Sequence, residues 1–238
     1  MKKLFLLTAV LSSTVGLFAA GEPFAAWNFD NVNGSIVPPA VGKWNLTLQN
    51  MPNIKVVPGK NGQAVAFLGK DKERNTVGSS YAGNVAFDCS KPFTVEVVFK
   101  LNKDAGYRNF KEILCFADGE RGPGLIVSIF YDRVILRSGD GKKTFDMNTD
   151  ATKTAIPREK WHMLTITYDG QTASIYFNGV LAAAGKFTVT LGKYNTLFVG
   201  SFRNAYAYAL QGAVDDLKLY NFAKTAGDVA ESYLAFEE

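Results

Sequence analysis

The most regular feature of the sequence is a set of short runs in which apolar and polar side chains alternate. In residues 93–101, Val95, Val97 and Phe99 lie on one face. Successive side chains of a strand point to opposite faces, so this alternation predicts a β-strand with one buried face. Glu96 falls on the other face, and we expect it to be exposed to solvent.

Similar runs recur along the chain and are separated by turn signals. We expect further strands at residues 24–29, 43–49, 63–68, 112–117, 124–131, 133–137, 161–168, 172–177, 180–184, 197–200 and 210–220. Asp140-Gly141, Asp169-Gly170 and Asn178-Gly179 have the residue types of tight hairpin turns. No domain linker, internal repeat or low-complexity tract interrupts this pattern.

The C-terminal segment instead has a helical pattern. Thr225 is a suitable N-cap, and Asp228 follows three residues later, as in a capping box. Val229, Tyr233 and Leu234 would form the apolar stripe of the helix. Many short strands with one terminal helix predict an all-β sandwich with a short C-terminal helix.

The last expected strand carries a carboxylate on its apolar face. Strict alternation places Ala213, Asp215, Leu217 and Leu219 on one face, and Val214, Asp216 and Lys218 on the other. A bare carboxylate is costly in apolar surroundings. Asp215 is therefore expected either to accept hydrogen bonds from main-chain amides or to bind a cation such as a structural calcium ion. Asp216 is expected to be solvated.

Composition and charge narrow the class of protein. The chain has 238 residues, 47% of them hydrophobic, which suits one domain with a sizeable core. Its 26 basic and 22 acidic residues give a net charge of +4. Loss of Lys2 and Lys3 with a leader would leave 24 basic against 22 acidic residues, or +2. Without a basic run, nothing in the charge pattern predicts nucleic-acid binding.

The N-terminal segment has the parts of a bacterial-type signal peptide. Lys2 and Lys3 form the charged end, residues 4–10 the apolar centre, and Ala19 and Ala20 offer small residues for cleavage. The stretch is too short and too interrupted for a good membrane span. We therefore predict a signal peptide at residues 1–21 and one exported domain at residues 22–238, periplasmic or secreted, without a membrane span.

Cys89 and Cys115 are the two cysteines of the chain. Export permits a disulfide between them. Two buried free thiols are an equal alternative, because the sequence does not give the separation of the two residues.

No set of residues in the sequence matches a known catalytic motif. The single histidine, His162, lies within an expected strand and is interpreted as structural. One histidine cannot supply a His-Glu-x-x-His zinc motif. Ser80 lacks the glycine two residues later that a nucleophile elbow requires.

Two segments, residues 161–179 and residues 212–221, together resemble the laminin-G-like, concanavalin A-like jelly-roll family. Residues 161–170, WHMLTITYDG, followed by residues 175–179, IYFNG, are similar to one of its paired-strand motifs. Residues 212–221, GAVDDLKLYN, are similar to its closing strand, and residues 27–30, WNFD, resemble its opening strand. The resemblance implies a two-sheet antiparallel jelly-roll sandwich whose first and last strands lie side by side.

The resemblance also bears on metal binding and catalysis. In many relatives a calcium ion ties the two chain ends together, which implies Asp215 as a ligand and, less directly, Asp30. Calcium prefers such carboxylate and carbonyl oxygens. Glucanases of this fold carry Glu-x-Asp-x-x-Glu on one strand. This sequence lacks that motif, which argues against hydrolysis of that type, whereas a lyase that uses Tyr, Arg and Lys is harder to exclude.

Two loops combine aromatic and hydrogen-bonding side chains, the mixture that holds sugars by stacking and by polar contacts. The candidate ligand residues are Arg203, Asn204, Tyr206 and Tyr208 in one loop and Tyr107 and Arg108 in the other. Taken singly, each aromatic residue is better explained by packing at a sheet edge. As clusters they predict a non-catalytic module that binds a polysaccharide or other glycan. A protein-binding adhesion module and a polysaccharide-cleaving hydrolase or lyase are the alternatives.

Overall fold

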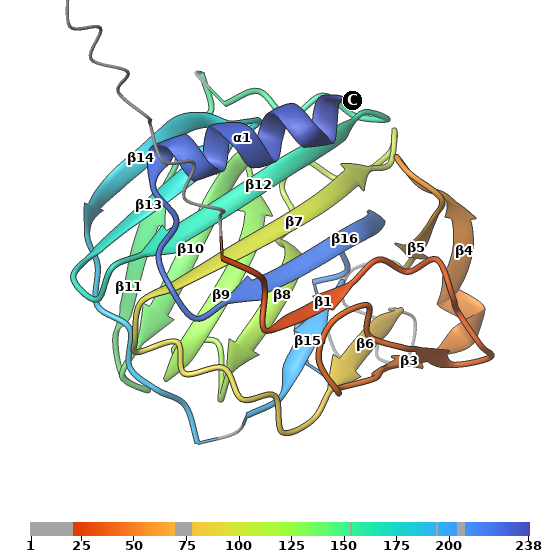
Figure 1. Cartoon of the computed structure of the whole chain (residues 1–238), viewed down its shortest axis with the longest axis horizontal. Helices are drawn as coiled ribbons and strands as arrows, with labels where there is room; N and C mark the ends of the chain where they lie inside the picture. The colour runs from red at the N-terminus through yellow and green to blue at the C-terminus, as the bar shows by residue number, and fades with distance from the viewer. Residues whose placement is uncertain (1–20, 70–77, 153, 194, 204–207) are drawn as a thin grey trace, which may run out of the picture.

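Two antiparallel β-sheets pack face to face, and one helix lies across the outside of the first sheet (Figure 1). The computed structural model describes residues 21–69, 78–152, 154–193, 195–203 and 208–238. The predicted all-β sandwich with a C-terminal helix is confirmed. Among the described residues, no helix is long and apolar enough to cross a membrane. The expected signal peptide lies almost entirely outside these residues.

The first sheet, sheet A, contains the first and last strands of the described chain. Its strand order is β14-β13-β12-β7-β16-β5-β4, and β1 also pairs with β16. The bounds are β1 (Ala25–Trp27), β4 (Ile54–Pro58), β5 (Gln63–Phe67), β7 (Phe93–Leu101), β12 (Trp161–Tyr168), β13 (Thr172–Phe177), β14 (Val180–Lys186) and β16 (Gly212–Tyr220). Trp27 pairs with Leu217, and Ala25 with Leu219, so the first and last strands lie side by side as the resemblance implied.

The second sheet, sheet B, has the order β11-β10-β9-β8-β15-β6-β3-β2. Its bounds are β2 (Ile36–Val37), β3 (Leu46–Gln49), β6 (Ser79–Ala82), β8 (Lys111–Ala117), β9 (Gly124–Phe130), β10 (Arg133–Gly139), β11 (Thr144–Asn148) and β15 (Leu197–Val199). A short 3-10 helix, η1 (Met51–Asn53), precedes β4.

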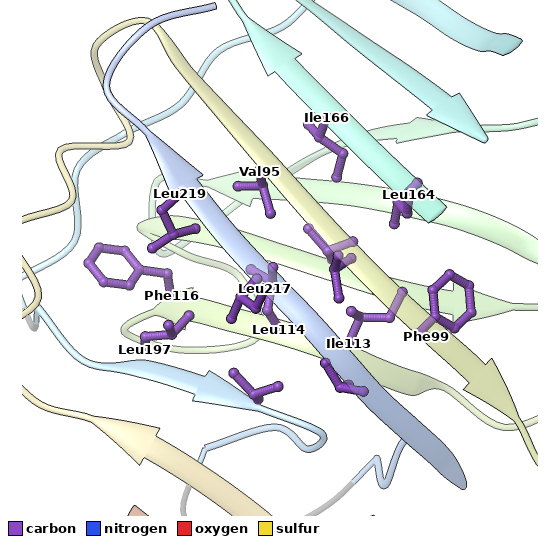
Figure 2. Close-up of a cluster of buried hydrophobic side chains, with 14 of the residues drawn as sticks. Val95, Phe99, Ile113, Leu114, Phe116, Leu164, Ile166, Leu197, Leu217 and Leu219 are labelled. Carbon is purple, nitrogen blue, oxygen red and sulfur yellow. The ribbon is translucent and has the colours of Figure 1, made fainter. Parts of the chain in front are cut away.

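The core is a layer of apolar side chains between the two sheets (Figure 2). Val95 and Phe99 of β7 and Leu217 of β16 face Ile113 and Phe116 of β8 across it, each at most 1% exposed. Burial of apolar area stabilises a fold by about 25 cal/mol per Å2. The alternation found in the sequence is thus what holds the two sheets together.

The final strand departs from strict alternation at its aspartates. The register of β16 against β7 shifts between Val214 and Leu217, which marks a β-bulge. Val214 therefore joins Leu217 and Leu219 in the core, whereas Ala213 packs on the opposite face. The expected grouping of Ala213 with the two leucines is wrong. Asp215 is buried, with 1% of its surface exposed, because it lies in this bulge.

The helix α1 (Ala226–Glu237) covers part of the outer face of sheet A (Figure 1). Thr225 and Asp228 form the predicted capping box. Phe236 packs against Val98 and Met163, whereas Leu234 is 63% exposed, so the expected stripe was wrong at Leu234.

Glu96 lies on the outer face of β7, as its parity predicted, but the expectation that it is exposed is wrong. Only 3% of its surface is accessible. Lys224, just before α1, donates from Nζ to its Oε1 at 2.7 Å, and the Tyr220 hydroxyl donates to its Oε2 at 2.7 Å. The segment that leads into the helix thus covers the carboxylate.

The cysteines and the histidine have structural surroundings. Cys89 and Cys115 are both free and buried, one in the main core and the other on the outer face of sheet B. His162 is 3% exposed, and its Nε2 lies 2.9 Å from the carbonyl oxygen of Pro157. The interpretation of His162 as structural agrees with these contacts.

Candidate ligand-binding site

The candidate site lies on the outer face of sheet B, the face turned away from the core. Along β8, Cys115 and Ala117 point to this face, whereas Phe116 points to the core. Cys115 pairs with Ile126 of β9, and Ile126 pairs with Arg137 of β10. Directly opposed residues on one face of a sheet are close neighbours, so this row forms the floor of the site.

A bulge in β8 brings Glu112 onto the same face. The register with β9 shifts between Glu112 and Leu114, so Ile113 and Leu114 both reach the core while Glu112 pairs with Ser128. Glu112 is 4% exposed, and its Oε2 has no hydrogen-bond partner among the described residues. A buried polar atom without a partner is rare in native proteins and costs free energy, so this one calls for an explanation.

Burial dominates the electrostatics of Glu112. Loss of solvation raises the pKa of its carboxyl group well above the ordinary value; the charge of Arg137 lowers that pKa and the charge of Glu120 raises it. Arg137 is itself paired with Asp146, to which Nε and Nη2 each donate at 2.8 Å. The guanidinium group therefore interacts with Glu112 in the pocket while it is also paired with Asp146.

A row of aromatic rings runs from the protein surface to Glu112. Centroid distances are 5.0 Å for Tyr107–Tyr131, 4.3 Å for Tyr131–Phe130, 4.2 Å for Phe130–Phe110, 5.6 Å for Phe110–Tyr208 and 5.9 Å for Tyr208–Phe202. The Tyr208 hydroxyl donates to Oε1 of Glu120 at 3.1 Å. Aromatic faces next to carboxyl groups provide both stacking and hydrogen bonding.

These groups enclose a pocket of about 200 Å3. Its lining is Phe110, Glu112, Glu120, Ile126, Arg137, Phe202 and Tyr208. Pockets for drug-sized ligands usually measure about 300–1,000 Å3. The volume therefore suits one small ring of a larger molecule.

The two loops singled out in the sequence meet at this pocket. Tyr208 of one loop contacts Phe110 of the other. Arg203 uses Nη1 to hold the carbonyl oxygen of Asp118, in the turn between β8 and β9. Asn204 and Tyr206 lie outside the described residues.

The other predicted residues lie at the outer end of the aromatic row. Tyr107 is 50% exposed and meets Tyr131 edge to face. Arg108 is exposed. The structure therefore places Tyr107 at the rim and Tyr208 in the pocket wall.

Sequence reasoning missed Glu112, Glu120 and Arg137. A carboxylate in an otherwise apolar run, KEILCFA, was the available signal. Whether a distant segment covers such a residue is set by the tertiary structure.

The predicted metal ligands meet at the turn between β4 and β5. Oδ2 of Asp215 accepts hydrogen bonds from the amides of Lys60 at 2.6 Å and Asn61 at 3.1 Å. Oδ1 of Asp30 accepts from the amide of Gln63 at 2.8 Å. The first of the two alternatives for Asp215, anchoring by main-chain amides, is therefore present.

The same turn has features that suit a cation. The pKa of Asp215 is raised to about 6, chiefly by burial and also by nearby Asp216 and Asp30, against the lowering effect of the Asn61 and Lys60 amides. Gly62 has a φ of +65°, and a Cβ there would collide with Oδ1 of Asp30. Among the described residues, no three His, Cys, Asp or Glu side chains form a metal-binding group. A cation here would need main-chain carbonyl oxygens as well, which calcium accepts.

Comparison of the sequence with known protein families shows to which family this chain belongs. A profile of the concanavalin A-like lectin/glucanase superfamily matches residues 74–230, more than half of the chain. The chain belongs to this superfamily. The resemblance seen in the closing and paired-strand motifs is confirmed. Among curated proteins, none matches this chain in sequence.

Solved structures show the same superfamily fold. The binding domain of botulinum neurotoxin DC, in complex with rat synaptotagmin II, aligns over 90% of this chain with a TM-score of 0.68 and 14% identity. The structure of a botulinum neurotoxin type C, whose cell entry is described as dependent on interaction with two ganglioside molecules, aligns over 91% of this chain with a TM-score of 0.69 and 11% identity. The binding domain of Paraclostridial Mosquitocidal Protein 1 aligns over 90% of this chain with a TM-score of 0.66 and 17% identity. The chain covers 51%, 52% and 52% of these three chains, about half their length.

Proposed function

We propose that this protein is an exported, non-catalytic carbohydrate-binding module whose ligand enters the pocket on the outer face of sheet B. The observation that carries the proposal is the convergence of Tyr208 and Phe110 beside Oε2 of Glu112, which has no hydrogen-bond partner among the described residues. A sugar ring offers an apolar face for the aromatic walls and hydroxyls for the carboxyl groups. The exposed ring of Tyr107 extends the surface for further sugar units.

The solved structures of similar fold support a binding role. One neurotoxin DC binding domain is in complex with SialylT, and the type C neurotoxin interacts with gangliosides. Another is in complex with the protein synaptotagmin II. A cell-surface protein is accordingly the alternative partner on the same fold.

A structural calcium ion at the β4–β5 turn is part of the proposal. Asp215 and Asp30 would supply carboxylate oxygens, and main-chain carbonyls of the turn would complete the shell. The ion would hold the β4–β5 turn against the first and last strands, because Asp30 follows β1 and Asp215 lies in β16. The proposed sugar pocket is on sheet B, so the calcium ion would not need to contact the sugar.

Export is supported by the sequence alone. The charged start, the apolar centre and the small residues before Gly21 have the order of a signal peptide. We infer that the mature domain begins near residue 22 and works in the periplasm or outside the cell.

Glycoside hydrolysis is the second candidate, and one observation favours it: Glu112 and Glu120 line the same pocket. Glycosidases use a pair of carboxyl groups, one of them protonated. Against it, the glucanase motif is absent and Glu120 accepts a hydrogen bond from Tyr208.

The experiment that tests the function is a glycan-array screen of residues 22–238, with and without calcium. We expect dose-dependent binding to a defined set of glycans, with no reducing sugar released from the polysaccharides that bind. Release of reducing sugar that is abolished by Glu112→Gln would instead assign hydrolysis. Binding to no glycan at any calcium concentration would contradict the proposal and favour a protein partner.

A further inference from the structure

The pocket contains one carboxyl oxygen whose surroundings favour a proton over a charge. Oε2 of Glu112 is buried and has no partner among the described residues, in a pocket whose walls are largely rings and Ile126. An ionised carboxylate needs several hydrogen bonds to compensate for lost water. A protonated carboxyl group has a lower desolvation cost and carries a donor of its own.

The groups that face Glu112 from neighbouring elements leave it without full compensation. Arg137 of β10 supplies a positive charge that is shared with Asp146 of β11. Glu120, in the β8–β9 turn, adds a negative charge. On its own strand, Cys115 is buried and its pKa is raised to about 12, first by burial and then by Glu112, so its thiol stays neutral.

Apart from Arg137, the described residues that line the pocket include no cation. Ser128 pairs with Glu112 from β9, and the Tyr208 hydroxyl donates to Glu120. Lys111, the preceding residue, donates from Nζ to the carbonyl oxygen of Asn109. Arg203 donates to the carbonyl oxygen of Asp118.

We propose that Glu112 presents a neutral carboxyl group to the bound glycan and donates a hydrogen bond from Oε2 to a sugar oxygen, which selects uncharged sugars. The inference rests on the proposed function and names the ligand class of the same pocket. Among the described lining residues, two are acidic and the one cation, Arg137, already has a bidentate carboxylate partner. A sialic acid or sulfate group would therefore lie beside the negative charge of Glu120, with no free cation among these residues to offset the repulsion.

Protonation of Glu112 makes binding depend on pH in a defined direction. Burial raises the pKa of this carboxyl group, so it is protonated at acid pH and ionises as the pH rises through that raised value. Ionisation removes the donor and adds a negative charge beside the ligand. Affinity should therefore be constant at acid pH and fall on the alkaline side.

The experiment uses the intact domain on an array of neutral, sialylated and sulfated glycans, read at intervals from pH 5 to pH 9. In parallel, difference infrared spectroscopy follows the carbonyl stretch of a buried protonated carboxyl group. We expect neutral glycans to bind and their affinity to fall over the same pH interval in which the Glu112 band disappears. Glu112→Gln keeps an uncharged donor, so at acid pH it should bind within about twofold of the parent, and it should keep that affinity at alkaline pH, where the parent loses it.

Two further variants separate the donor from the shape of the pocket. Glu112→Ala should weaken binding about five- to tenfold at acid pH, the loss expected for one hydrogen bond to a ligand. Glu231→Gln, an exposed position on α1, serves as the matched control and should leave affinity, pH profile and infrared band unchanged. Near-ultraviolet circular dichroism checks that every variant is folded.

The outcomes distinguish the inference from the function on which it rests. A parent that binds no glycan at any pH contradicts the proposed function, and the inference falls with it. Glycan binding with the same pH profile in parent and Glu112→Gln overturns the inference alone. Absence at pH 5 of a protonated-carboxyl band that Glu112→Gln removes, or preference for sialylated or sulfated glycans, overturns it as well.

Discussion

Burial of a carboxyl group makes the stability of this protein depend on the protonation of one side chain, Glu112. Its folded-state pKa is raised by burial, whereas in the unfolded chain it titrates near its ordinary value. Its stabilising contribution is therefore complete below the unfolded pKa and is lost as the pH rises towards the folded one. The penalty grows by about 1.4 kcal/mol per pH unit within that interval.

Glu112→Gln should consequently leave the melting temperature nearly unchanged at pH 4 and raise it at pH 7. The amide cannot ionise, so the variant avoids the cost that the parent incurs. Thermal unfolding of both proteins from pH 4 to pH 8 measures the difference. A melting-temperature difference that is independent of pH would show that Glu112 ionises equally in the folded and unfolded states.

Tyr208 connects the two loops at the scale of single side chains, and its ring contributes more than its hydroxyl. Tyr208→Ala should weaken glycan affinity about tenfold, because it removes a stacking wall worth about 1–1.5 kcal/mol. Isothermal titration with the best array glycan measures this. Tyr208→Phe is the matched control: it retains the ring, loses the contact to Glu120, and should bind within about threefold. Equal affinity of Tyr208→Ala and parent would place the ligand elsewhere.

At the scale of elements, α1 is held to sheet A by a buried ion pair as well as by apolar packing. Lys224 and Glu96 are 3% and 4% exposed at their side chains, and Lys224 also donates to Ser232 of the helix at 2.8 Å. Removing one member of a buried pair leaves an uncompensated charge, at a typical cost of about 3–5 kcal/mol.

Lys224→Met should therefore destabilise the domain by about 3–5 kcal/mol in urea unfolding, and adding Glu96→Gln should recover a large part of that loss. Lys55→Met, on exposed β4, is the matched control and should change stability by less than about 0.5 kcal/mol. If the double variant is as unstable as Lys224→Met, the pair contributes through packing rather than charge. Glycan binding should be unchanged, since the pair lies on the other sheet.

The elements also show where sequence reasoning succeeds and where it stops. Period-two alternation was sufficient to find β7, whose inner face is apolar, and β12, whose inner face is apolar except for His162. It failed at β16 because a bulge changes parity without any change in residue type, and so Ala213 was assigned to the wrong face. It could not reveal that Glu96 and Glu112 are buried, because each is covered by a segment distant in sequence. The two aromatic loops were found, but their meeting at Phe110 and Tyr208 is a property of the tertiary fold.

At the scale of the whole molecule, the two ends of the described domain meet at one turn. β1 pairs with β16, and Asp30 and Asp215 each accept hydrogen bonds from the β4–β5 turn. A calcium ion at this place would bridge three segments that are far apart in sequence. It would act on global unfolding, because separating any of the three segments would break the site.

Calcium should therefore raise the melting temperature of the parent through its preference for the folded state. At a calcium concentration one hundred times the Kd, the gain is about 2.7 kcal/mol. For a domain of this size that corresponds to about 5–10 °C. Asp215→Asn removes a charged ligand, so it should melt below the parent in calcium and respond little to a chelator.

Asp216→Asn is the matched control for that variant, since it removes the same charge one residue away. Asp216 is half-buried and lines two pockets with Lys218 and Tyr220 on the outer face of sheet A. Lys60 and Asn61 also line one of these pockets, but their amides donate to Asp215. It should retain the calcium response of the parent. Differential scanning calorimetry with calcium and with chelator compares the three proteins. Equal chelator sensitivity in Asp215→Asn and parent would exclude Asp215 as a calcium ligand. Loss of the calcium response in Asp216→Asn alone would identify Asp216 as the ligand instead.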